Sequence, residues 1–171
     1  MRHFAVVVAG ERLARERLYA DDLIAVDDAA ALPSGAEVVL VALDPGPVLF
    51  GLGRATVGGA VRYTHRLLDA PLPVSLDAGV GTWPLDARTF DALAGKVDAT
   101  HRVGAGRRSW LVNLSLPVEA STAPEAVRAF WSYVRDLGPT ELPAFVSPSG
   151  DELAMQVYVL GGEANQDPED D

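Results

Sequence analysis

The sequence contains no cysteine among its 171 residues. Disulfide bonds, thiolate zinc sites, iron–sulfur clusters and cysteine nucleophiles are therefore excluded, and a reducing compartment is expected. The sequence also lacks any apolar run approaching the roughly 20 residues that a helix needs to cross a bilayer. The apolar stretch Phe4 to Ala9 ends at Gly10, which is too early for the core of a signal peptide. We therefore expect a soluble, cytoplasmic protein that does not contact a membrane.

Catalytic signatures are missing as well. No Gly-x-Ser-x-Gly turn presents a nucleophilic serine, and the three histidines, His3, His65 and His101, are not paired at the spacing of metal ligands. The glycine pairs at Gly51/Gly53 and Gly79/Gly81 lack the third glycine of a dinucleotide fingerprint and the Gly-Lys-Ser/Thr ending of a phosphate loop. The sequence thus predicts no metal, no cofactor and no enzymatic activity.

Lysine is nearly absent, because 13 of the 14 basic residues are arginine, and the net charge of −10 is unevenly distributed. Residues 48–110 hold 8 basic and 5 acidic side chains, whereas residues 111–171 hold 2 and 11. The middle of the chain could therefore bind an anion, and the acidic last third could bind a basic protein. A compositional bias without functional content is the favoured explanation of the preference for arginine.

Three successive strands are predicted after Pro33. Val38 to Leu43 is β-branched and apolar throughout, which is typical of a strand buried on both faces. The turn Asp44 to Pro47 leads to a second strand, in which Gly51 and Gly53 indicate a bulge, a bend or a close approach of the backbone to another group. The pair Gly58-Gly59 supplies the positive φ angles of a tight hairpin before a third strand that begins at Val61.

Other elements of the first 108 residues follow from composition and periodicity. Phe4 to Ala9 is predicted to be a strand, and helices are predicted over Glu11 to Leu18 and Leu85 to Val97. The pair Asp21-Asp22 is interpreted as a helix N-terminus. Two loops are expected, a glycine-rich one over Asp77 to Pro84 and a cationic one over Thr100 to Arg108.

The last third of the chain predicts a β-α-β-β unit. Alternation from Trp110 to Leu116 indicates a half-buried strand. The run Thr122-Ala-Pro-Glu125 is a capping box, and apolar residues then recur at helical spacing until Gly138. Strands over Ala144 to Ser147 and Leu153 to Leu160 form a hairpin. Trp131 and Tyr133 are expected to pack against the sheet.

The segment Gly-Ala-Glu-Val-Val-Leu-Val-Ala, followed by a turn and by Val-Leu-Phe-Gly-Leu-Gly-Arg-Ala, resembles the strand order of PUA-like barrels of the EVE and ASCH groups. The resemblance covers Phe4 to about Val97, with Ala36-Glu37 standing where that family has aspartate. It implies a small barrel that binds a nucleotide or a modified base in RNA or DNA. Such a pocket needs aromatic walls and cations. The candidate residues are Phe50, Arg54, Tyr63, His65, Arg66 and Trp83.

Together these observations predict an α+β protein. A small mixed β-barrel over residues 1–108 precedes the β-α-β-β unit over residues 109–161, and residues 162–171 form an acidic, disordered tail. The function favoured is non-catalytic binding of a nucleotide or nucleic acid. Two alternatives are a protein-interaction or scaffolding module that uses the acidic C-terminal unit, and an enzyme acting on a small anionic substrate. For each candidate residue, core packing or a solvated surface is the structural alternative.

Overall fold

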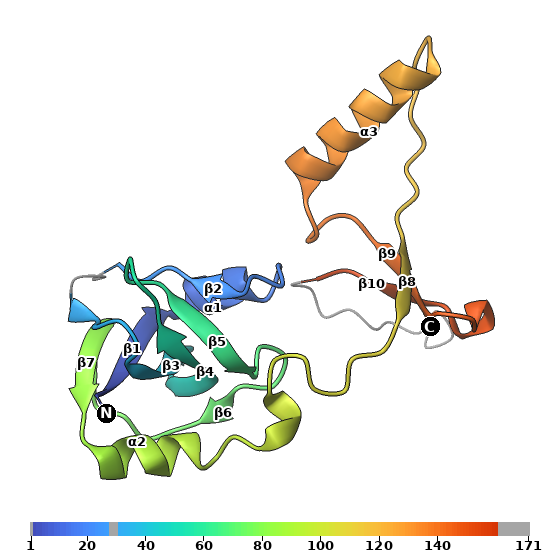
Figure 1. Ribbon diagram of the computed structural model, residues 1–171. Coiled ribbons are helices and arrows are strands. Elements are labelled where there is room, and N and C mark those ends of the chain that lie inside the picture. Colours follow the sequence, from blue (N-terminus) through green and yellow to red (C-terminus); the bar gives the residue numbers. More distant parts are fainter. Residues whose placement is uncertain (1, 28–30, 161–171) are drawn as a thin grey trace. The chain divides into compact units, whose positions relative to one another are not determined.

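The computed structural model describes residues 2–27 and 31–160, and the chain divides into two compact units, Met1–Gly106 and Arg107–Asp171 (Figure 1). The first unit contains seven strands and two α-helices: β1 (His3–Ala9), α1 (Gly10–Glu16), β2 (Leu23–Ile24), β3 (Glu37–Leu43), β4 (Pro47–Ala55), β5 (Val61–Arg66), β6 (Leu72–Pro73), β7 (Gly81–Leu85) and α2 (Ala87–Ala94), followed by the short 3-10 turn η2 (Ala99–His101). The second unit contains β8 (Trp110–Asn113), α3 (Ala123–Leu137), β9 (Ala144–Pro148), the 3-10 turn η3 (Glu152–Ala154) and β10 (Gln156–Tyr158). The α+β class is therefore confirmed.

The strands of the first unit form one mixed sheet in the order β2-β5-β4-β3-β1-β7, and β6 pairs with β4. Strands β1 and β3 run parallel and every other pair is antiparallel. Strand β3 lies in the middle, and its residues 38 to 42 are all buried, which confirms the strand buried on both faces. Leu13 of α1 packs with Val38 and Leu40 on one face, whereas Phe90 of α2 packs with Val39 on the other.

The predicted bulge is confirmed on both sides of β4. The register with β3 shifts between Leu40 and Val41, and the register with β5 shifts between Leu52 and Gly53. A Cβ at Gly51 would lie 3.0 Å from the Tyr63 ring, and a Cβ at Gly53 would lie 2.6 Å from the Arg62 carbonyl oxygen. Both glycines therefore let β5 approach β4 more closely than any other residue type allows.

The sheet does not close. Within residues 2–27 and 31–160 the pairing ends at β2 on one side and β7 on the other, so no closed barrel is present. The interpretation of Asp77 to Pro84 as a loop is wrong, because Gly81–Leu85 pairs with β1 and forms an edge strand. The pair Asp21-Asp22 precedes the short strand β2, so its interpretation as a helix N-terminus is also wrong.

The second unit contains the predicted β-α-β-β elements, arranged as an antiparallel sheet in the order β10-β9-β8. The capping box is confirmed. The Thr122 hydroxyl accepts a hydrogen bond from the Glu125 N–H at 3.3 Å, and the Glu125 carboxylate accepts one from the Ser121 N–H at 3.0 Å. Gly138 ends α3 with φ 69°, a backbone conformation that glycine adopts readily.

The second unit has very little core. The expectation that Trp131 and Tyr133 pack against the sheet is wrong, because both side chains are exposed and α3 has no buried residue. All four residues of β8 are exposed, contrary to the half-buried strand predicted there. Of the described apolar residues after position 106, Leu142 alone is buried. The predicted tail, residues 162–171, lies outside the described residues.

No helix in the described part of the chain combines the length and the apolar character needed to span a membrane.

Candidate functional site

The lining of an open hollow of about 580 Å³ in the first unit includes three of the sequence candidates, Arg54, Tyr63 and His65. The hollow lies where the C-terminal half of β5 meets the chain that follows α2. Its lining includes Glu37, Arg54, Tyr63, Thr64, His65, Ala99, Arg102 and Val103. Its volume falls within the range of roughly 300–1,000 Å³ that is usual for ligand pockets.

A bulge in β5 builds this hollow. His65 pairs with Leu52 and Tyr63 pairs with Gly53, so Thr64 is the extra residue between them. Its carbonyl oxygen instead accepts a hydrogen bond from the Val103 N–H at 2.9 Å, and a β-bridge joins His65 to Arg102. The bulge therefore attaches residues 102 and 103 to the free edge of β5 and brings a second arginine beside the strand.

The two arginines of the hollow, Arg54 and Arg102, have few acidic side chains near them. Arg54 lies 3.6 Å from the Glu37 carboxylate, and its side chain is 55% exposed. An exposed pair at this distance contributes little to stability and leaves most guanidinium donors available. Arg102 is exposed and has no ion pair within the described part of the chain. Glu37 is the only acidic residue among the described lining residues.

His65 adds an uncharged ring to this cationic surface. Partial burial lowers its pKa below the ordinary value of 6.5, and the neighbouring Arg102 and His101 side chains lower it further. His65 is therefore neutral at pH 7. A neutral imidazole presents one donor and one acceptor, and its flat ring can also stack on a base.

The turn η2 is held in place by Asp98. Its carboxylate accepts hydrogen bonds from the Thr100 side chain and from the Thr100 N–H, and these hydrogen bonds lower the pKa of Asp98. His101 Nδ1 lies 3.1 Å from the same carboxylate. Asp98 thus fixes the turn from which Arg102 extends.

The other three sequence candidates lie elsewhere. Phe50 is completely buried in the cluster that contains Leu13 and Val38, so its side chain cannot form a wall of the hollow. Trp83 is on β7, at the opposite edge of the sheet from β5, and its indole donates a hydrogen bond to the Gly79 carbonyl oxygen at 2.8 Å. The structure therefore does not bring the predicted aromatic walls together.

Arg66 lies on the other face of the sheet from His65, since the two residues are adjacent on β5. Its guanidinium lies over the Tyr63 ring, 5.0 Å from the centroid, and 3.2 Å from the Asp22 carboxylate. Tyr63 is itself 5% exposed and donates a hydrogen bond from its hydroxyl to Glu16 at 3.0 Å. Arg66 and the Tyr63 hydroxyl are therefore occupied by contacts within the protein and do not face the hollow.

Arg102 and Glu37 were not among the sequence candidates. Arg102 belongs to the segment that the sequence identified as a cationic loop, so its charge was visible but its position beside β5 was not. The sequence signal for that position is the pair Gly51 and Gly53, because the bulge at Thr64 of β5 forms opposite this part of β4. No sequence pattern singles out Glu37.

A second cavity of about 420 Å³ lies at the C-terminal end of β1. Arg12 and Arg15 of α1 contribute to its lining, together with Asp27 and Thr82. The Thr82 hydroxyl is buried without a hydrogen-bond partner among the described residues. Arg12 is already paired with Glu16 at 2.9 Å, so this cavity offers less free positive charge than the hollow beside β5.

No group of three or more acidic or histidine side chains that could hold a metal ion is found within residues 2–27 and 31–160. Comparison of the chain with protein-family models, with curated proteins and with solved structures gives no significant match.

Proposed function

We propose that the first unit is a non-catalytic binding module for a nucleotide, a modified base or a nucleic-acid strand, held at the hollow beside β5. The observation that carries the proposal is the meeting of Arg54, Arg102 and His65 around one open surface. Guanidinium groups bind phosphate through paired hydrogen bonds, and the neutral imidazole of His65 can stack on a base or hydrogen-bond its edge. A PUA-like origin of the sheet would agree with this ligand class, but the proposal does not depend on it.

Binding is tested with a fluorescent single-stranded RNA, a matching DNA and a mononucleotide, titrated with the full chain at several salt concentrations. We expect affinity to fall as salt rises, because phosphate binding releases counterions. Arg54→Ala and Arg102→Ala should each weaken binding about tenfold, which corresponds to one charged hydrogen bond, and each should reduce the salt slope by about one. The mononucleotide arm shows whether one nucleotide is sufficient.

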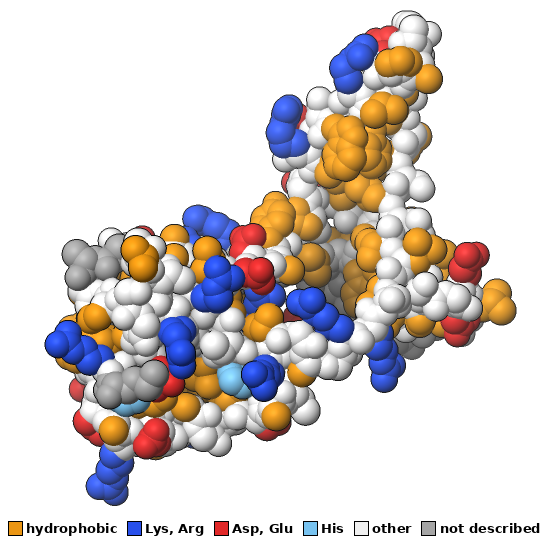
Figure 2. Space-filling view, in the orientation of Figure 1, with side chains coloured by type: hydrophobic (Ala, Val, Ile, Leu, Met, Phe, Trp, Pro, Cys, Tyr) orange, Lys and Arg blue, Asp and Glu red, His pale blue; other side chains and the backbone are white. Residues whose placement is uncertain are grey.

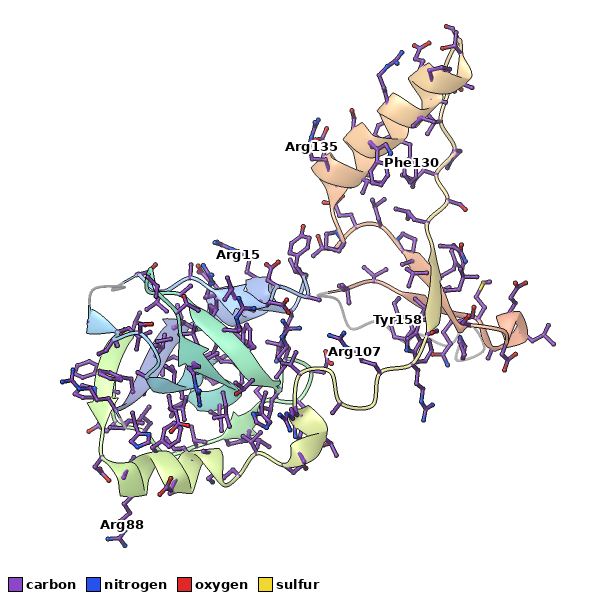
Figure 3. The ribbon with its side chains drawn as sticks, in the orientation of Figure 1. Arg15, Arg88, Arg107, Phe130, Arg135 and Tyr158 are labelled. Atoms are coloured by element: carbon purple, nitrogen blue, oxygen red, sulfur yellow. The ribbon has the colours of Figure 1, made fainter. Side chains whose placement is uncertain are left out.

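Two controls separate this site from general attraction of anions. Arg88 on α2 projects away from the sheet (Figure 3), so Arg88→Ala should leave the affinity unchanged. Arg66→Ala should also leave it unchanged in the folded fraction, because Arg66 faces the other side of β5. Equal losses in the Arg54 and Arg88 variants, or the absence of binding to all three ligands, would refute the proposal.

The alternative function, a protein-interaction module in the second unit, has its own support. This unit is acidic and exposes Trp110, Val112, Trp131 and other large apolar side chains. Exposed apolar surface with a charged surround is typical of interaction sites. If this alternative holds and the hollow is not used, the Arg54 and Arg102 variants will behave as wild type, and capture of a basic partner will depend on residues 111–171.

A further inference from the structure

Helix α3 presents an apolar stripe in which no residue is buried. Residues spaced by three and four positions form the stripe, the arginines Arg128 and Arg135 flank it, and Glu125 and Asp136 lie on the other side of the helix. The stripe consists of Val127, Phe130, Trp131, Val134 and Leu137. Figure 3 shows Phe130 and Arg135 projecting from opposite sides of α3, and Figure 2 shows apolar side chains gathered over this helix. Trp131 is 63% exposed.

The three-stranded sheet of the same unit presents a matching apolar face. In the strand register, Val112 lies opposite Val146, Trp110 lies two residues from Val112, and Tyr158 lies opposite Ala144. Residues directly opposite, or two apart on one strand, point to the same side of a sheet. Trp110, Val112, Val146 and Tyr158 therefore share one face with the polar Gln156, which lies opposite Val146, and Trp110, Val112 and Tyr158 are exposed on it.

In the structure α3 does not cover this face. Residues 114–122 and 138–143 form two long connections that hold the helix apart from β8, β9 and β10 (Figure 1). Pro117 lies in the first connection, and Pro139 and Pro143 lie in the second. Proline restricts the backbone of both connections, which opposes their folding back on the sheet.

We propose that two copies of the chain exchange their α3 helices. The apolar stripe of each helix packs on the face formed by Trp110, Val112, Val146 and Tyr158 in the other copy. One chain supplies both complementary surfaces, so a twofold exchange covers the helix and the sheet of each copy at once and leaves no open end. A partner that bound only the helix or only the sheet would leave the other surface exposed.

Charge agrees with this pairing. Both cations of residues 111–160, Arg128 and Arg135, are on α3. The hairpin of β9 and β10 carries Asp151 and Glu152 and no cation. Strand β8 carries no charge at all, although natural edge strands are commonly protected by charged residues or proline. The sheet is thus suited to a neutral apolar stripe with arginines along its border.

The exposed area supplies a large part of what a dimer requires. An aromatic side chain buries roughly 150–250 Å² when fully covered. Three aromatic side chains of the stripe and the sheet face are 38–63% exposed, namely Trp110, Trp131 and Tyr158. Val112, Val127 and Leu137 add further apolar area. Covering these side chains brings the area buried by each copy towards the about 800 Å² per partner that is usual in stable complexes.

The oligomeric state of the full chain tests the first part of the proposal. Light scattering at micromolar concentration should give twice the 18.1 kDa of one chain. The double variant Val127→Asp/Trp131→Asp should be monomeric, because two carboxylates in the stripe would be buried on exchange. The matched control Ala129→Asp/Ser132→Asp adds the same charge on the other side of α3 and should remain dimeric. A monomeric wild type, whose α3 is covered by its own chain or by a different protein, would overturn the proposal.

Cross-linking then distinguishes exchange from another kind of dimer. Because the chain has no cysteine, Trp131→Cys and Val112→Cys each introduce a unique thiol. The two variants, one with a mass tag, are mixed and treated with a short bismaleimide. Exchange predicts a product that joins one tagged and one untagged chain. In a chain carrying both cysteines, diluted with excess wild type, exchange predicts that cross-linking is lost, because the cysteine-free partner offers no thiol opposite either position. Predominant linkage within one chain would overturn the proposal.

Discussion

At the scale of single residues, a buried hydrogen-bond network explains why some polar side chains of β5 are unavailable to a ligand. The Glu16 carboxylate is 9% exposed and accepts hydrogen bonds from Arg12 at 2.9 Å and from the Tyr63 hydroxyl at 3.0 Å. Burial raises the pKa of Tyr63, and the Glu16 carboxylate raises it further, so the phenol remains protonated. A buried carboxylate needs such partners, and Tyr63 is committed to that task.

The pKa of His65 gives a prediction that combines stability and binding. Because the pKa of His65 is lower in the folded than in the unfolded protein, the folded state binds fewer protons as the pH falls below 6.5. The stability contributed by neutral His65 is therefore fully present above pH 6.5. It is lost as the pH falls through the lowered pKa of the folded protein. The His65→Gln variant should therefore lose less stability than wild type between pH 7.5 and pH 5, as measured by urea denaturation. Equal acid dependence of the two proteins would contradict the assignment.

The same group reports on the ligand. An anionic ligand in the hollow favours protonated His65, so nuclear magnetic resonance titration of its ring should show the pKa rising when a nucleotide is added. Arg102→Ala removes a positive neighbour and should raise the pKa of His65 without ligand.

At the scale of elements, sequence reasoning was most reliable where one local pattern decides the structure. The apolar run of β3, the double glycine at the hairpin and the capping box of α3 each contain their own physical cause, and all three were predicted correctly. Strand β7 was missed because Gly79 and Gly81 suggest a loop, whereas pairing with β1 forms the strand. The partners that complete such a strand lie more than 70 residues away in the sequence.

The candidate site was predictable only in part for the same reason. Alternation along β5 is interrupted by the bulge at Thr64, so His65 and Tyr63 do not share a face as strict alternation suggests. Likewise, the periodicity of α3 correctly identified its apolar stripe but not what covers it. An amphipathic pattern states that a face will be buried and leaves open whether the same chain buries it.

The glycines of β4 allow a quantitative test at this scale. Gly53→Ala should destabilise the first unit by about 1–3 kcal/mol, because the new methyl group would meet the Val61 side chain and the Arg62 backbone. Gly79→Ala is the matched control, since no atom lies within 4 Å of its Cβ position. It should change the free energy of unfolding by no more than about 0.5 kcal/mol. Similar urea denaturation midpoints for the two variants would show that β4 and β5 are not held as closely as described.

At the scale of the whole molecule, the two units differ in how much apolar surface each buries. Within the described part of the chain, every buried apolar residue except Leu142 belongs to residues 1–106. Two hydrophobic clusters, one on each face of the central sheet, stabilise that unit. Small domains bury a small fraction of their surface even when well packed, so they have little stability to spare. With Leu142 as its one buried apolar residue among those described, the second unit has too little core to be stable by itself.

This difference predicts unequal behaviour when the units are separated. Residues 1–106 produced alone should fold, show dispersed nuclear magnetic resonance signals and unfold cooperatively in urea as a monomer, because both faces of the sheet are covered within the fragment. Residues 107–160 produced alone should fold only as the concentration rises, since exchange of α3 between copies would supply the missing core. A second fragment that is folded and monomeric at every concentration would mean that α3 covers its own sheet, and a first fragment without cooperative unfolding would mean that the central sheet requires the rest of the chain.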